Sequence, residues 1–294
     1  MLPLSLSSIR MSEEVPFNFC GLPEQYSSFN NSAVVVLPVP FDETSTWLKG
    51  ADKGPDAVIE ASRHLELYDR ETDSEVYKKG ICTARAVCAS GAEKMVSEVR
   101  QQTASLIREG KFVVTVGGEH SISIGAAGAH AASYQDMGIL HLDAHADMRD
   151  EYEGSRYNHA CTVARLKETV DRVVSVGIRS MDISEREKAD ESMVFYADYI
   201  HTSEDWIAEA VELLPERVYI TIDLDVFDPG IMPSTGTPEP GGLDWYQVVG
   251  LLKAVSERRT IVGFDVSELC PSDNKAPDFL AAKLIYKLLS YKFV

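Results

Sequence analysis

Three short polar motifs contain the residues of this sequence that are best suited to chemistry: GGEHS at 117–121, DAHAD at 143–147 and DLD at 223–225. Each motif follows a run of apolar residues that is typical of a buried β-strand. Because alternate residues of a strand point to the same face, we expect the acidic and histidine side chains of these motifs to converge. The side chains of metal-ligand type are His120, Asp143, His145, Asp147, Asp223 and Asp225.

This set of four carboxylates and two imidazoles indicates bound cations. Carboxylates gathered at the end of a buried sheet repel one another, and each is costly to remove from water. Two divalent ions that share bridging carboxylates would use all six side chains and leave room for water. Oxygen and imidazole ligands without a thiolate favour Mn²⁺ over a structural zinc. Two dications balance the carboxylates, so a bridging hydroxide leaves a negative charge that a cationic substrate would neutralise.

Each motif taken alone has a plainer interpretation. An isolated Asp-X-Asp at a strand end is more often a turn or a helix cap than a pair of ligands, and only the three motifs together favour a metal site. The remaining histidines are expected in ordinary positions: His64 and His201 at the surface, His130 on a helix, and His141 packed beside the site without binding metal.

The elements that must position these motifs alternate along the whole chain. Six apolar runs predict strands, at 33–40, 112–118, 138–145, 172–179, 217–226 and 260–269. Helical spacing predicts helices over 92–110, which Gly110 stops, and over 244–257, which Asp244 caps. This alternation predicts an α/β fold with a mostly parallel sheet, helices on both faces, and ligands bound at the carboxyl ends of the strands. No linker divides the pattern, so we expect one catalytic domain over residues 31–294 and an irregular N-terminal arm over residues 1–30.

The composition narrows the class of partner. With 28 basic and 46 acidic side chains the formal charge is −18, which argues against nucleic acid and anionic membranes and for cations. No apolar run approaches the roughly 18 residues of a spanning helix, and no signal peptide is recognisable, so we expect a cytoplasmic protein. Five scattered cysteines without a Cys-X-X-Cys pair argue against a disulfide framework and a thiolate metal site.

Longer segments around the three motifs resemble the ureohydrolase family of arginases and agmatinases. The similar segments are GGEHSIS at 117–123, HLDAHADMRDEYEG at 141–154 and TIDLDVFDPGIMPSTGTPEPGGL at 221–243. The resemblance implies a three-layer α/β/α arginase-like fold, two Mn²⁺ per subunit on the same six ligands, and hydrolysis of a guanidino group to urea and an amine. It also implies that His159 shuttles a proton, that Glu268 binds the guanidinium, and that Asp147 accepts a hydrogen bond from the nucleophile.

The resemblance leaves the substrate open. Arginases bind the amino-acid end of their substrate through an asparagine two residues past the DAHAD motif, where this sequence has Arg149. The segment is instead similar to microbial agmatinases, so agmatine, cleaved to putrescine and urea, is expected ahead of arginine or guanidinobutyrate. Asp150, Glu151 and Glu153 crowd Arg149 in the sequence and are expected to pair with it, and Thr237 is expected to contact the substrate.

Hypotheses from other classes make different demands on the sequence. A catalytically silent family member that acts as a scaffold would be favoured by the loss of a ligand, of His159 or of Glu268, and none of these is lost. A single-zinc deacetylase of related fold would not use the histidine of GGEHS. Family members are commonly trimers or hexamers, so the resemblance implies a homo-oligomer that binds a small cationic guanidino substrate.

Overall fold

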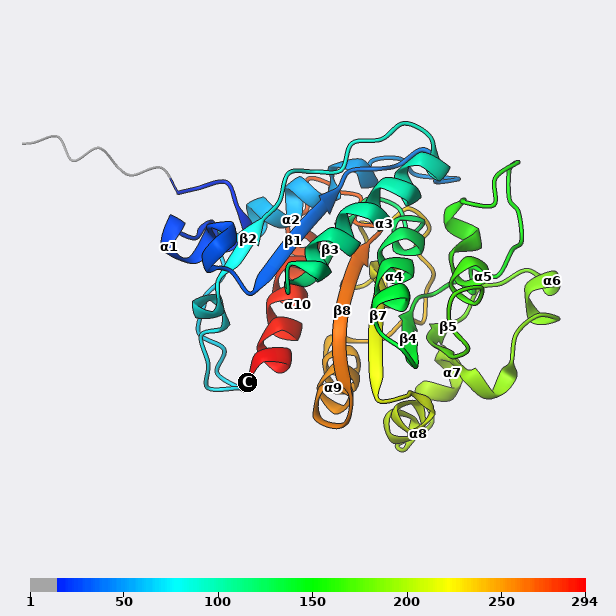
Figure 1. Cartoon of the computed structure of the whole chain (residues 1–294). Helices are drawn as coiled ribbons and strands as arrows, with labels where there is room; N and C mark the ends of the chain where they lie inside the picture. The colour runs from blue at the N-terminus through cyan, green and yellow to red at the C-terminus, as the bar shows by residue number, and fades with distance from the viewer. Residues whose placement is uncertain (1–14) are drawn as a thin grey trace, which may run out of the picture.

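The centre of the molecule is one sheet of eight parallel strands in the order β2-β1-β3-β8-β7-β4-β5-β6 (Figure 1). The structure is a computed structural model and describes residues 15–294. The strands are β1 (Val34–Val39), β2 (Ile81–Thr83), β3 (Phe112–Gly117), β4 (Met137–Leu142), β5 (Val173–Ile178), β6 (Val194–Tyr196), β7 (Arg217–Asp223) and β8 (Thr260–Ser267). The long strands are buried almost throughout, as their continuous apolar runs predicted.

Helices cover both faces of this sheet (Figure 1). One layer contains α3 (Ala92–Arg108), α4 (Ile122–Ser133) and α5 (Thr162–Leu166), and the other contains α2 (Gly54–Ser62), α8 (Trp206–Leu213), α9 (Trp245–Arg258) and α10 (Ala276–Phe293). Alternate side chains of the strands enter two separate apolar clusters: Ile220 and Ile222 of β7 face the second layer, and Tyr219 faces the first. The predicted three-layer α/β/α fold is confirmed. Within residues 15–294, no helix is both long enough and apolar enough to cross a membrane.

All six predicted strands and both predicted helices are present. In α9, Asp244 accepts a hydrogen bond from the backbone N of Gln247, whose side chain accepts one from the backbone N of Asp244 in return, so the expected N-cap is confirmed. The edge strands β2 and β6 were not predicted, because three residues are too few to show a period.

The shorter elements connect this frame. They are α1 (Glu24–Ser27), α6 (Ile183–Arg186), α7 (Ala197–Ile200), η1 (Phe19–Gly21), η2 (Phe29–Asn31), η3 (Ala51–Lys53), η4 (Val76–Lys79), η5 (His159–Cys161), η6 (Glu191–Met193) and η7 (Leu224–Val226). Residues 1–14 of the predicted N-terminal arm lie outside the described residues. Its described part forms η1, α1 and η2, and Phe19 and Leu22 are buried in the same apolar cluster as β1 and α10. This part of the arm therefore packs on the domain.

Candidate active site

Four neighbouring strands bring the candidate site together at their carboxyl ends. β3, β8, β7 and β4 are adjacent in the sheet, and the motifs GGEHS, SEL, DLD and DAHAD each begin at the last residue of one strand or directly after it. Because the strands are parallel, these ends lie at the same edge. The backbone N of His120 donates to Oε1 of Glu268 at 2.7 Å, although 148 positions separate the two residues.

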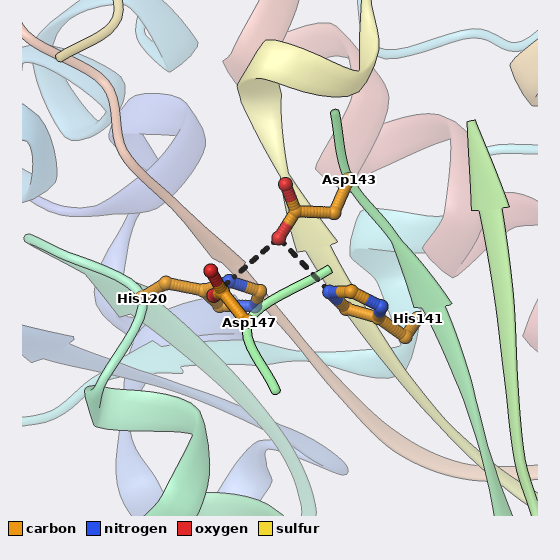
Figure 2. Close-up of side chains that lie close together, drawn as sticks. All are labelled: His120, His141, Asp143 and Asp147. Atoms are coloured by element: carbon orange, nitrogen blue, oxygen red, sulfur yellow. Dashed lines mark hydrogen bonds and ion pairs between the residues drawn. The ribbon is translucent and has the colours of Figure 1, made fainter. Parts of the chain in front are cut away.

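His120 contacts three carboxylates of the first group of ligand-type side chains, two of which, Asp143 and Asp147, are drawn in Figure 2. Its Nδ1 lies 3.0 Å from Oδ2 of Asp143, 3.1 Å from Oδ2 of Asp147 and 3.5 Å from Oδ2 of Asp223. His120 and Asp143 are fully buried, and the two other carboxylates are nearly so. Side chains from three different strand ends therefore face one point.

His145 forms the second group with Asp225 and shares Asp143 with the first. Its Nδ1 lies 2.9 Å from Oδ2 of Asp225 and 3.5 Å from Oδ1 of Asp143. The two oxygens of Asp143 thus face different histidines, which suits a carboxylate shared between two ions. His141 donates from Nε2 toward Oδ2 of Asp143 at 2.9 Å, and its Nδ1 contacts Oγ of Ser175. His141 therefore lies among the ligand-type side chains of the first group, in contact with Asp143.

The convergence of these side chains has a different local cause from the predicted one. β4 ends one residue before Asp143, so the DAHAD motif is not a strand, and Asp147 has a φ of 52°. A left-handed conformation is uncommon outside glycine and is often found at functional sites. Asp225 lies in the 3₁₀ turn η7, where its backbone N donates to Oδ1 of Asp223 at 2.9 Å. Strand alternation was therefore the wrong reason for Asp147 and Asp225, which lie beyond the strands, whereas Asp223 is the last residue of β7.

The charges in this cluster are unusual for a buried site. Burial, with the Asp143 carboxylate adding to it, raises the pKa of Asp147 to about 7. Burial, together with the charges of Asp225 and Asp143, raises the pKa of Asp223 well above its usual range. Burial alone would lower the pKa of His145, but Asp225 and Asp143 raise it to about 12. Against burial, hydrogen bonds with His120, His141 and His145 hold the pKa of Asp143 well below its usual range. Buried carboxylates that depend on neighbouring positive charge in this way, with imidazoles beside them, form a donor set that fits divalent cations.

A cavity of about 270 Å³ opens over the cluster. The three residues that were predicted beyond the ligand set to serve catalysis or substrate binding line it, namely His159, Glu268 and Thr237. Arg149, which stands where arginases have the asparagine that binds the substrate, lines it as well. Nδ1 of His159 lies 3.9 Å from Oε1 of Glu268. Among the described residues, Nε2 of His159 has no hydrogen-bond partner. The cavity therefore combines a buried carboxylate, an imidazole with a free nitrogen and the cluster of metal-ligand side chains.

Comparison with known proteins assigns this arrangement to a family. The model of the arginase family matches residues 32–290. This chain belongs to the arginase family. The ureohydrolase is 37% identical to N(1)-aminopropylagmatine ureohydrolase of Synechocystis sp., over 94% of this chain and 96% of that protein. It is 32% identical to agmatinase of Pyrococcus horikoshii, over 87% and 90%. Among solved structures, agmatine ureohydrolase of Thermoplasma volcanium is similar with a TM-score of 0.85, 30% identity and 94% coverage of each chain. The chain is thus an agmatinase-like hydrolase.

Arg149 of this ureohydrolase has other partners than those predicted. Its Nη2 lies 3.9 Å from Oδ2 of Asp182, its Nε lies 3.8 Å from Oε2 of Glu185, and its guanidinium carbon lies 4.5 Å from the ring centre of Tyr152. Asp150 points to solvent and pairs with basic side chains farther along the chain. The prediction that Arg149 pairs with its acidic sequence neighbours was wrong, because its ion pairs are with Asp182 and Glu185 and none is with Asp150, Glu151 or Glu153.

The sequence prediction missed two acidic residues of the cavity, Asp182 and Glu185. They follow β5, whose carboxyl end lies at the same edge of the sheet as the motifs. Glu185 is buried and accepts hydrogen bonds from the backbone N of Met148 at 2.8 Å and of Asp182 at 2.7 Å. The rule that ligands bind at strand ends, applied to the run 172–179, would have found both residues. It would also have found Thr46, which lines the cavity in the segment after β1.

Proposed function

We propose that this ureohydrolase cleaves the guanidino group of N(1)-aminopropylagmatine, with agmatine as a second substrate. The supporting observation is a single cavity that is lined by two acidic sets of residues. One set consists of the ligand-type cluster and the buried Glu268, and the other consists of Asp182, whose side chain is partly exposed, and Glu185. A guanidinium fits the carboxylate of Glu268, and the ammonium groups of a polyamine tail fit the outer acidic pair. Water supplies the oxygen of urea, and the amine that leaves is spermidine from the longer substrate and putrescine from agmatine.

The order of the two substrates rests on the relatives. Four N(1)-aminopropylagmatine ureohydrolases are 36–39% identical to this chain, and the agmatinase of Pyrococcus horikoshii is 32% identical. We propose agmatine as the second substrate for two reasons. The segment MRDEYEG is similar to that of agmatinases, and the agmatine ureohydrolase of Thermoplasma volcanium shares the fold. Both substrates are cations, which suits a chain with a formal charge of −18.

The proposed cofactor is a pair of Mn²⁺ ions. The residues that would hold them are His120, Asp143, His145, Asp147, Asp223 and Asp225, and this set of oxygens and imidazoles without thiolate suits Mn²⁺. When bound, the ions would supply the Lewis acidity that makes water a nucleophile near neutral pH. Metal binding would also displace protons from the two histidines, because only the neutral imidazole binds metal.

The side chains around this centre have distinct roles in the proposal. Oε1 of Glu268 already accepts the backbone N–H of His120, and the backbone N of Glu268 is held by the carbonyl of Gly118 at 2.7 Å. Its Oε2 is therefore available to orient the guanidinium by a charge-assisted hydrogen bond. Asp147 accepts a hydrogen bond from the attacking water, and Nε2 of His159 delivers a proton to the departing nitrogen. Thr237 lines the cavity and is a candidate for a hydroxyl contact with the substrate.

Urea release from four compounds tests this proposal. N(1)-aminopropylagmatine, agmatine, arginine and guanidinobutyrate are compared by kcat/KM, each with Mn²⁺ and after chelation. We expect kcat/KM to decrease in the order in which the compounds are named, and we expect no urea after chelation. Fastest turnover of arginine or guanidinobutyrate would contradict the cationic-tail assignment. No urea from any compound would support a silent scaffold.

Matched variants test the role of the outer acidic pair. Asp182→Asn keeps the size of the side chain and its capping oxygen but removes its charge, so KM for N(1)-aminopropylagmatine should rise about tenfold. KM for guanidinobutyrate, whose tail is an anion, should not rise. Asp150→Asn is the control, because Asp150 is exposed and does not line the main cavity. Equal effects of the two variants on KM would contradict the assignment of Asp182.

The subunit arrangement is also part of the proposal. From the family resemblance we infer a homo-oligomer, a trimer or a hexamer. One chain has a mass of 32.4 kDa, so multi-angle light scattering of the purified protein distinguishes these states. A mass of a single chain at working concentration would contradict this inference.

A further inference from the structure

Glu119 of the GGEHS motif takes no part in the proposed reaction, yet it is completely buried beside the site. Its carboxylate accepts hydrogen bonds from the backbone N of Thr44 at 2.6 Å and of Ser45 at 2.9 Å. It also accepts hydrogen bonds from the hydroxyl groups of Thr44 and of Ser121. Thr44 and Ser45 are 75 and 74 positions away in the sequence. Glu119, which lies just after β3, thus holds the segment that follows β1 in place by hydrogen bonds.

This segment approaches the motif very closely. The backbone N of Gly118 donates to the carbonyl of Val39, and the backbone N of Glu119 donates to the carbonyl of Phe41, both at 2.8 Å. A Cβ atom on Gly118 would lie 1.9 Å from the carbonyl oxygen of Phe41, so only glycine permits this approach. The end of β1 and the residues after it, up to Phe41, are therefore held against the end of β3, close to Thr44.

Thr44 in turn contacts the loop that carries His159. Its Oγ1 accepts a hydrogen bond from the backbone N of His159 at 3.0 Å, and its carbonyl accepts one from Nδ2 of Asn158 at 3.4 Å. Because Oγ1 of Thr44 accepts the N–H of His159, its own hydroxyl proton is free to point to Glu119. A lone pair of the same oxygen then faces the N–H of His159. Glu119 thereby orients the hydroxyl group that holds the His159 backbone.

We propose that Glu119 is a positioning residue that acts through Thr44 on His159. It places the imidazole in the cavity and thereby sets the rate of proton delivery, without contacting the substrate. This inference rests on the proposed function, in which His159 carries the proton. A purely structural role of Glu119 would change stability but would not act selectively through His159.

Kinetics of Thr44 variants separate these roles. Thr44→Val has the same shape but no hydroxyl, and it should lower kcat by about tenfold, because small displacements of a catalytic group have large effects on rate. KM and manganese content should stay within about twofold of wild type. The tenfold decrease in kcat, which corresponds to about 1.4 kcal/mol, is clearly larger than this. Thr44→Ser, which keeps the hydroxyl, should restore most of the rate. A Thr44→Ser enzyme as slow as Thr44→Val would contradict the inference.

A double-mutant cycle tests whether the effect passes through His159. Thr44→Val should cause no further loss of rate in a His159→Ala enzyme, because the group that it positions is absent. Glu119→Gln replaces an acceptor by a donor at the same volume and should be non-additive with Thr44→Val. An equal loss from Thr44→Val with and without His159 would show that Thr44 acts by another route.

Hydrogen exchange provides a readout that does not depend on activity. The backbone amide of His159 should exchange faster in Thr44→Val and Glu119→Gln than in wild type, and at the wild-type rate in Thr44→Ser. Unchanged exchange in both of the first two variants would refute the positioning role. If the wild-type enzyme released no urea but showed this exchange pattern, the proposed reaction would fail while the positioning of the His159 loop would stand.

Discussion

The buried histidine of α4 should make the stability of this protein depend on pH. His130 is fully buried; its Nδ1 donates to the carbonyl of Ala126 at 2.8 Å, and its Nε2 has no partner among residues 15–294. Its ring lies against Tyr219, with 4.6 Å between ring centres, and against Gly263. Burial among these groups lowers the pKa of His130 from 6.5 to about 4. The folded protein therefore requires a neutral imidazole.

The expected size of the effect follows from this pKa. Between pH 6.5 and about 4 the unfolded chain binds a proton at His130 more readily than the folded chain. Stability is therefore complete above this window and decreases as the pH falls through it, by a total of about 3 kcal/mol. The decrease between pH 7 and pH 5 is about 2 kcal/mol. His130→Asn keeps a donor toward Ala126 and does not titrate, so it should escape this decrease.

The loss of stability on acidification can be measured by urea unfolding followed by tryptophan fluorescence. The free energy of unfolding is compared between pH 7 and pH 5 for wild type and for His130→Asn. Groups of the metal site titrate in both proteins and cancel in the comparison. The variant should be less stable at pH 7, because it leaves space beside Tyr219, and should lose about 2 kcal/mol less than wild type on acidification. Equal losses in the two proteins would refute the assignment of a neutral, buried His130.

Further substitutions at the packing contact of His130, at Arg149 and at two histidines of the site have defined outcomes. Gly263→Ala would place a Cβ atom 2.1 Å from Nε2 of His130 and should destabilise the protein by about 2 kcal/mol. His130→Ala in the same chain should recover part of this loss in urea unfolding, and no recovery would show that the contact is not the cause. Arg149→Met removes a cation from the outer acidic pair and should lower KM for N(1)-aminopropylagmatine by about threefold to tenfold. An increased KM in steady-state kinetics would contradict the assignment of this pair to the polyamine tail. His120→Ala should lose manganese in metal analysis, whereas His159→Ala should keep it and lose rate by about a hundredfold; full rate in the second variant would exclude proton transfer by His159.

The strands were predictable because each is a short, continuous apolar run that ends in a polar motif. Buried parallel strands need apolar side chains on both faces, and this requirement is visible in one dimension. β2 and β6 were not predictable in the same way, because three residues show no period and their place depends on the neighbouring strand. The end of β4 was predicted three residues too late, at His145, because the motif after it continues the alternation of apolar and polar residues.

The types of the site residues were predictable, and their geometry was not. The motifs identify His120, Asp143 and Asp225 as ligand-type residues, because few other functions place carboxylates and histidines at successive strand ends. The left-handed turn at Asp147 leaves no trace in the local sequence, since aspartate adopts it under the constraint of the surrounding structure. The same holds for Arg149, whose acidic partners come from the segment after β5 and not from its own.

The sequence by itself determined the fold class, the family and which residues are of metal-ligand type, because these depend on residue types and on periods within single segments. Only the tertiary structure decided which distant segments meet. Glu119 reaches Thr44, 75 positions away, because β1 lies next to β3 in the sheet. Thr44 in turn reaches His159, 115 positions away, across the edge where the parallel strands end. The order of strands is set by how their apolar faces pack together, and no local pattern around Glu119 contains that information.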